Sequence, residues 1–184
     1  MIVCKLNSKM KDDSSQIRCD YSKKCEDLIN LQINEELRAH YTYMGMAFHF
    51  DRDDVALSGF YKFFIKMSDE ELGHARELMK FQNQRGGRIF LSLIPAPKNY
   101  DDAESLTPLS SMKKGLQMET DIYYLLKRIH KTASLEGDCV LTNKLEEMLK
   151  EQVLSIKEFG DFVTNLTRVG PGLGEYEIDH HLNN

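Results

Sequence analysis

The chain has 184 residues and a mass of 21.3 kDa, which fits one domain large enough to bury a hydrophobic core. Its 24 Lys and Arg against 29 Asp and Glu give a net charge of −5, which argues against a nucleic-acid partner. Hydrophobic residues make up 41% and charged residues 29%, so a disordered tail is excluded. Because no run of about 18 apolar residues occurs, the sequence predicts no membrane span.

Four long stretches carry apolar residues at alternating steps of three and four, the pattern of a helix with one buried face. They follow a polar N-terminal extension, residues 1–13, and predict helices over about 22–50, 55–83, 104–134 and 138–166. Gly and Pro at 170–172 end the fourth helix, and residues 173–182 predict a short fifth one. The expected fold class is therefore all-α, with residues 14–184 forming a single domain.

The connections between the helices constrain the topology. Short turns near 51–54 and 136–138 make the helices antiparallel within each pair, and Asp53 or Asp54 is expected to cap the second helix. The roughly 20 residues between the second and third helices can reach about 65 Å, which exceeds the roughly 42 Å length of a 28-residue helix. This loop can cross the bundle lengthwise. The sequence thus predicts a four-helix bundle with one long crossover.

Five polar residues stand near the midpoints of the helices, at positions that should be apolar. Ionised carboxylates are rarely buried without a partner, because desolvation costs several kcal/mol per ion, and no Lys or Arg shares these positions. Helices packed side by side would bring the five side chains to one level, where the missing positive charge is most simply a metal ion. The five residues are Glu36, Glu71, His74, Glu119 and Gln152.

The residue types indicate the class of metal. Carboxylates with one imidazole suit iron, manganese or zinc, and the lack of thiolates at these positions argues against structural zinc or an iron–sulfur cluster. Glu71 and His74 are three residues apart, so both reach the same inward spot. Tyr43 is either a core tyrosine or a hydrogen-bonding neighbour of the site. His40 and His130 are expected to be packed or interface histidines.

Three segments resemble the heavy-chain, ferroxidase-bearing type of animal ferritin. They are residues 50–57 (FDRDDVAL), residues 83–91 (NQRGGRIFL) and residues 151–166, which begin EQV and end DFVTNL. The resemblance covers about residues 14–182 and implies a ferritin-like fold. It also implies a hollow shell of twenty-four copies, built alone or with other ferritin subunits, that stores ferric mineral.

The same resemblance implies roles for the mid-helix residues. Glu71 would bridge two irons, Glu36 and His74 would complete one of them, and Glu119 would serve the other with Gln152 nearby. Tyr43 matches the tyrosine beside that site. The implied reaction is oxidation of Fe(II) to Fe(III) by O2, with iron passing through as substrate. A non-catalytic subunit of the light-chain type is the alternative, and the filled ligand positions disfavour it. A metal-free helical binding module is disfavoured by the mid-helix acids.

Three features depart from the heavy-chain pattern. The acidic cluster that seeds mineral keeps one acid, since its positions read Glu70, Gly73 and Arg76. The acidic pair of the three-fold channel falls on Thr142 and Leu145, or on Asn143 and Glu146 if a gap lies inside the helix. The pair is incomplete either way, which predicts slower iron uptake. Glu177 stands where the family has an apolar residue at the four-fold channel.

The cysteines and the first residues bear on location. Cys4, Cys19, Cys25 and Cys139 form no close motif, which favours reduced thiols. The opening residues lack the apolar stretch of a signal peptide. The expected location is the cytoplasm.

Overall fold

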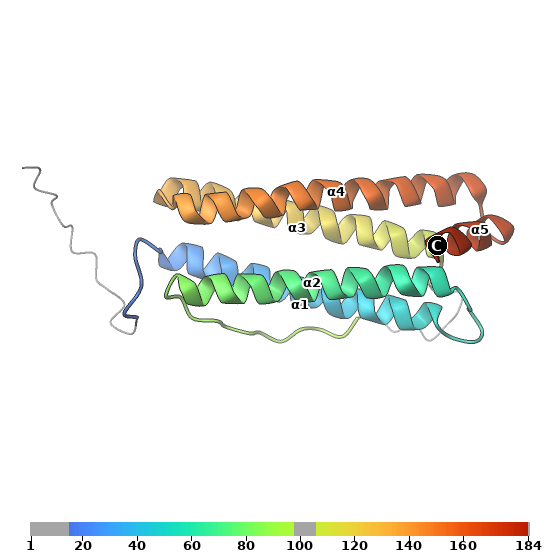
Figure 1. Ribbon diagram of the computed structural model, residues 1–184, viewed down its shortest axis with the longest axis horizontal. Helices are drawn as coiled ribbons and strands as arrows, with labels where there is room; N and C mark the ends of the chain where they lie inside the picture. The colour runs from blue at the N-terminus through green and yellow to red at the C-terminus, as the bar shows by residue number, and fades with distance from the viewer. Residues whose placement is uncertain (1–14, 98–105, 184) are drawn as a thin grey trace, which may run out of the picture.

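Four long helices packed side by side make up most of the chain in the computed structural model, which describes residues 15–97 and 106–183. The helices are α1 (Lys23–Phe50), α2 (Ser58–Gln84), α3 (Pro108–Glu136) and α4 (Cys139–Val169). The short α5 (Leu173–Leu182) lies across one end of the bundle (Figure 1). The described residues contain no strand, so the all-α prediction is confirmed. The predicted extension, residues 1–13, lies outside the described residues.

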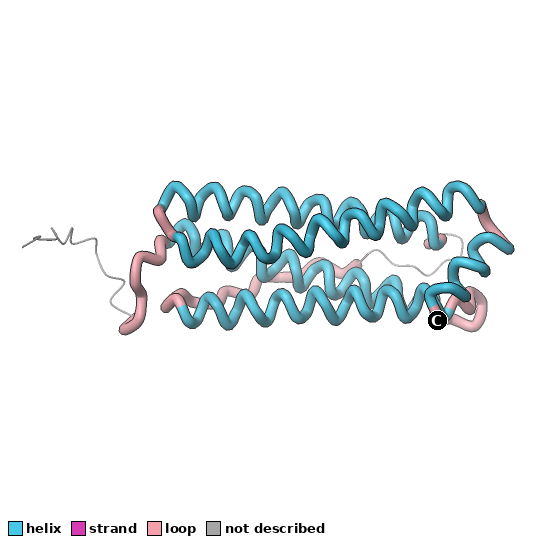
Figure 2. Tube along the Cα trace, turned by 45° about the horizontal axis from the view of Figure 1, so that its top comes forward, coloured by secondary structure: helices cyan, strands magenta, loops and turns pink. Residues whose placement is uncertain are grey.

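The helix order matches the predicted topology. α1 packs against α2 and α3, and α3 packs against α4, so two antiparallel pairs form the bundle. Residues 85–97 leave α2 as an extended segment and run lengthwise beside the α1–α2 pair, as Figure 2 shows in pink. This segment is the described part of the crossover. Among the described helices, none combines the length and apolar character needed to span a membrane.

Local capping sets three of the helix boundaries. The Ser22 side chain accepts from Cys25 N at 3.2 Å, and Asp138 Oδ1 accepts from Leu141 N at 2.9 Å. The predicted start of the third helix near 104 is wrong within the described residues, since 106 and 107 are not helical. Thr107 and Ser110 form a capping box there, and Pro108 occupies the first turn, so α3 begins at Pro108.

The predicted capping of α2 by Asp53 or Asp54 is also wrong. The helix begins later than predicted, at Ser58, and its N-cap Leu57 supplies no side-chain hydrogen bond. The cap comes instead from α5, where the buried Asp179 accepts from Phe60 N through Oδ1 at 2.9 Å. A carboxylate at this end of a helix also interacts favourably with the helix dipole. Asp179 therefore fastens α5 to the start of α2.

Gly59 allows this close approach. A Cβ atom on Gly59 would lie 2.0 Å from the backbone oxygen of Asp179. We expect Gly59→Ala to lower the stability of the bundle by about 1–3 kcal/mol, because the backbone of α5 must move. Gly73 is the matched control on the same helix, since a Cβ atom added there would meet nothing within 4 Å. Gly73→Ala should raise stability by about 0.5–1 kcal/mol. Thermal unfolding of both variants tests this, and shifts of the same sign would contradict it.

Candidate metal centre

The acidic positions predicted from the sequence meet in the middle of the bundle. Glu36 comes from α1, and Glu71 and His74 come from α2 one turn apart. One ligand atom from each of the three lies within 4.8 Å of the others. Glu36 is 1% exposed and Glu71 is 5% exposed, whereas His74 is half-buried. These residues form a compact group of two carboxylates and one imidazole.

Glu119 of α3 extends this group from the other helix pair. Its Oε1 accepts a hydrogen bond from the buried Tyr43 hydroxyl, and its Oε2 accepts from Gln152 Nε2 of α4. Gln152 Nε2 also lies 3.0 Å from the Glu119 backbone oxygen. Glu119 is close enough to Glu71 for each to perturb the ionisation of the other. All four long helices therefore contribute a residue to one buried region.

Simultaneous ionisation of the three buried carboxylates is unfavourable in this region. Burial raises the pKa of Glu71 to about 8, and the negative charge of the nearby Glu119 adds to this increase. Burial and then the charge of Glu71 raise the pKa of Glu36 well above its ordinary value, and burial raises that of Glu119. Within the described part of the chain no Lys or Arg forms an ion pair with these three carboxylates. A bound cation would remove the repulsion and favour ionisation.

The donor set fits such a cation. In its ionised form Glu36 leaves Oε2 buried and without a hydrogen-bond partner among the described residues. Buried polar atoms are rarely left in this state unless a water or an ion fills the site. Carboxylate oxygens with one imidazole nitrogen are suitable ligands for iron, manganese and zinc.

The structure adds two residues that the sequence interpretation missed. Gln32, one turn before Glu36, donates from Nε2 to Glu36 Oε1 at 2.8 Å. Glu151 of α4 brings Oε2 to 3.8 Å from His74 Nε2 at the more exposed side of the group. The four-residue spacing of Gln32 and Glu36 is the signal that could have found Gln32, because such side chains meet on a helix.

The two other histidines on apolar faces lie apart from the acidic group. His40 Nδ1 contacts the Ser68 backbone oxygen at 2.9 Å and the Ser68 hydroxyl at 2.8 Å, which joins α1 to α2. His130 Nε2 lies 3.5 Å from Glu146 Oε1, between α3 and α4. Neither belongs to the carboxylate–imidazole group found in the described residues.

The structure also shows which of the residues that depart from the heavy-chain pattern are exposed and which are buried. Gly73, Arg76 and Glu70 are exposed on α2. Leu145 is 0% exposed and belongs to the core, whereas Asn143 and Glu146 are exposed near the start of α4. An acid at position 145 would be buried among apolar side chains. The exposed pair is therefore the better candidate for a polar surface that attracts cations.

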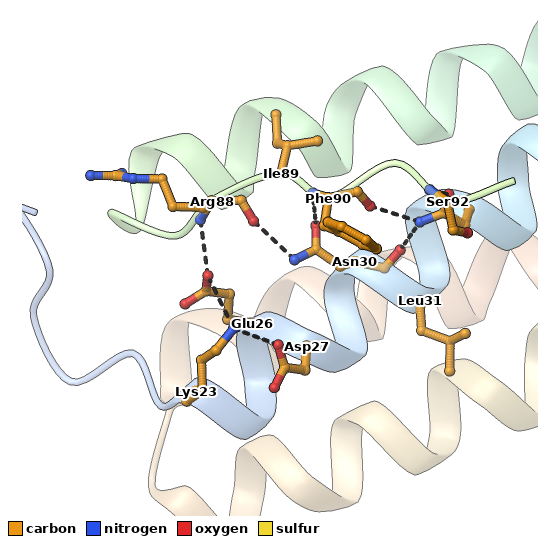
Figure 3. Close-up of a pocket in the computed structure, with 10 residues that line it drawn as sticks. Lys23, Glu26, Asp27, Asn30, Leu31, Arg88, Ile89, Phe90 and Ser92 are labelled. Atoms are coloured by element: carbon orange, nitrogen blue, oxygen red, sulfur yellow. Dashed lines mark hydrogen bonds and ion pairs between the residues drawn. The ribbon is translucent and has the colours of Figure 1, made fainter. Parts of the chain in front are cut away.

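An open groove of about 500 Å³ lies away from the acidic group, between α1 and the segment that follows α2 (Figure 3). Asn30 donates to Arg88 O at 2.9 Å and accepts from Phe90 N at 2.9 Å, and Asn34 Oδ1 accepts from Ser92 N at 2.8 Å. These bonds hold the extended segment against α1. The candidate carboxylates thus lie inside the bundle and not in this groove.

Comparison with known proteins agrees with this arrangement. Residues 26–169 match the ferritin family, described as a ferritin-like domain. The chain is 51% identical over 166 residues to soma ferritin from Lymnaea stagnalis, a match that covers 90% of this chain and 94% of that relative. The family match spans most of α1, the whole of α2 and α3, and α4 to its last residue. The chain therefore belongs to the ferritin family of iron-storage proteins.

Proposed function

We propose that the protein is a ferroxidase as well as a storage protein, and that it oxidises Fe(II) to Fe(III) with O2 at a di-iron centre inside the bundle. Glu36 and His74 hold one iron, Glu71 bridges the two, and Glu119 holds the second with Gln152 nearby. Tyr43 acts as a hydrogen-bonding neighbour of Glu119. The observation that carries this proposal is the buried group of Glu36, Glu71 and His74, whose carboxylates have no Lys or Arg partner in the described chain.

The ligand set supports iron as a substrate that passes through the site. Hard oxygen donors stabilise Fe(III) relative to Fe(II), so each bound Fe(II) gives up one electron to O2 readily. Di-iron proteins that retain their metal carry Glu-x-x-His on two helices. Here α4 has Glu151 followed three residues later by Leu154, which is 70% exposed. The second iron is therefore held weakly, and the ferric product can leave.

We further propose that copies of the chain assemble into a cage that encloses the ferric mineral, alone or with other ferritin subunits, in the cytoplasm. The extended segment after α2 supports assembly, because Phe90 and Leu93 are 69% and 92% exposed. Apolar side chains exposed together mark surfaces that pack against a partner. The free thiols of Cys19, Cys25 and Cys139 agree with a reducing compartment.

The experiment that tests this function adds Fe(II) in air to the chelator-treated protein and follows ferric absorbance and particle size. We expect prompt oxidation and a particle far larger than the 21.3 kDa monomer. A large particle that oxidises iron no faster than buffer would indicate a non-catalytic, light-chain-type subunit. A monomer that binds no iron would contradict both proposals.

Iron uptake through the start of α4 gives a separate prediction. Acidic surfaces raise the local concentration of cations, and salt weakens this effect. We expect Asn143→Asp, which places a second acid near the exposed Glu146, to speed oxidation of sub-stoichiometric Fe(II) by up to about tenfold at low ionic strength. The measurement is the initial rate against salt concentration.

The matched control for this prediction is Asn165→Asp, an exposed change on the same helix roughly 33 Å away. It should leave the rate and its salt dependence unchanged. If both variants accelerate oxidation equally, the added charge acts on the particle as a whole and the start of α4 has no special part in uptake.

A further inference from the structure

Gln32 is a buried polar residue on the interior face of α1, one turn before Glu36. It is 0% exposed, as are its neighbours Ile29 and Ile33 on the same face. Its Nε2 donates to Glu36 Oε1 at 2.8 Å. Its other amide atom, Oε1, is buried and has no hydrogen-bond partner among the described residues. A core position that served packing alone would be filled better by an apolar side chain, because a buried amide that is only half satisfied is costly.

The two unpartnered acceptors lie on neighbouring turns of one helix. Gln32 Oε1 is bonded to the same carbon as the nitrogen that contacts Glu36, so it lies beside the Glu36 carboxylate. Glu36 Oε2, in the ionised form, is the other acceptor without a partner. An unsatisfied buried group in a native protein calls for an explanation such as a water or an ion. A hydrated cation held by Glu36 would supply partners for both atoms.

The two halves of the acidic region share the same arrangement of an amide against a carboxylate. Gln152 Nε2 donates to Glu119 Oε2 on the α3–α4 side, and Gln32 Nε2 donates to Glu36 Oε1 on the α1–α2 side. In each case a glutamine on the interior face donates to one carboxylate oxygen. The other oxygen of Glu36 stays available for a metal. Partners of this kind fix the orientation of metal ligands and commonly set metal affinity.

We propose that Gln32 is the positioning residue for the iron held by Glu36, an inference that rests on the proposed function of this site. Its amide nitrogen holds Glu36 Oε1, which leaves Oε2 to bind the ion. Its amide oxygen accepts a hydrogen bond from a water molecule bound to that ion. The effect is local, because Glu119 has its own partners in Tyr43 and Gln152.

The test is an anaerobic titration of the assembled, metal-free protein with Co(II), followed by the visible absorption of the bound ion. Gln32→Met and Gln32→Leu replace the amide with an apolar side chain of similar volume. We expect each to weaken one of the two Co(II) equivalents per subunit by about 10–100-fold, with a changed absorption spectrum. The second equivalent and the unfolding temperature should stay near those of the parent.

Gln82→Met is the matched control, because Gln82 is also 0% exposed and hydrogen-bonded but lies roughly 16 Å along α2 from Glu71. It should leave both Co(II) equivalents unchanged. If the Gln32 variants lower the unfolding temperature and weaken both equivalents alike, the role of Gln32 is structural and the inference is wrong.

Glu36→Ala separates this inference from the function on which it rests. If Glu36→Ala removes one Co(II) equivalent while Gln32→Met retains both with parental affinity, the metal site stands and the positioning role is overturned. If Glu36→Ala leaves the titration of the parent unchanged, the assignment of the metal site itself is wrong.

Discussion

Replacing Glu71 with alanine is expected to abolish the proposed fast oxidation of Fe(II) while leaving the proposed cage assembled. Glu71 is 5% exposed and is the carboxylate that lies close both to Glu36 and to Glu119. In the proposed di-iron centre, neither iron would keep its full ligand set without Glu71. Loss of an outer partner of a metal ligand already costs about 10–100-fold, so loss of the proposed bridging ligand should slow oxidation by more than about 100-fold. His74→Ala should act in the same direction by removing the only imidazole of the group.

Stopped-flow absorbance after a small Fe(II) dose measures this, and light scattering verifies that the particle is intact. Asp69→Ala is the matched control, since Asp69 is exposed on the same helix two residues before Glu71. It should oxidise iron at the parental rate. A Glu71→Ala, His74→Ala double variant that also kept the parental initial rate would place the reaction elsewhere in the protein.

The bundle could be predicted from the sequence because each long helix repeats an apolar face. Ile29 and Ile33 in α1, and Phe60 and Phe64 in α2, recur at steps of four and are all 0% exposed. A pattern this long constrains helix type and packing face more strongly than the propensity of any single residue. The crossover also followed from chain length alone, since a loop of that size reaches the far end of the bundle.

The ends of the helices could be predicted less well, because they depend on contacts between residues distant in sequence. The cap of α2 comes from Asp179, 119 positions after Phe60. Asp54 looked like the nearer capping residue, yet it accepts from Arg52 in the loop instead. A local pattern cannot distinguish these alternatives, because the cap exists only after α5 has packed against α2.

The acids of the candidate site could be predicted from sequence alone, since a charged residue among the apolar residues of a helix face is easily recognised. Gln32 was not predicted, because an uncharged amide interrupts the apolar pattern of that face less clearly. Its significance comes from the atoms that it leaves without partners, and these appear only in three dimensions. Leu145 illustrates the same limit, since the sequence left open whether Leu145 or Glu146 stands at the channel position, and only the structure shows that Leu145 is fully buried.

The stability of the metal-free protein should fall as the pH rises from about 4.5 to about 8. The folded protein holds the Glu71 proton up to a pKa of about 8, whereas the unfolded chain releases it near 4.5. Across this window the folded state binds more protons, so the free energy of unfolding decreases with pH by up to about 1.4 kcal/mol per unit for one such group. The raised pKa values of Glu36 and Glu119 act with the same sign.

Glu71→Gln is the variant that isolates this effect, because it keeps the shape of the side chain and removes its charge. At pH 8, in the presence of a chelator, its unfolding temperature should exceed that of the parent by roughly 2–4 °C for each kcal/mol that ionisation of Glu71 costs a chain of this size. Near pH 5, where Glu71 keeps its proton in the folded protein, the difference should shrink towards zero. The exposed control Asp69→Asn should show no such dependence. A constant offset between Glu71→Gln and the parent from pH 5 to pH 8 would mean that Glu71 is ionised throughout, and that the buried carboxylates are already compensated within the protein without a metal ion.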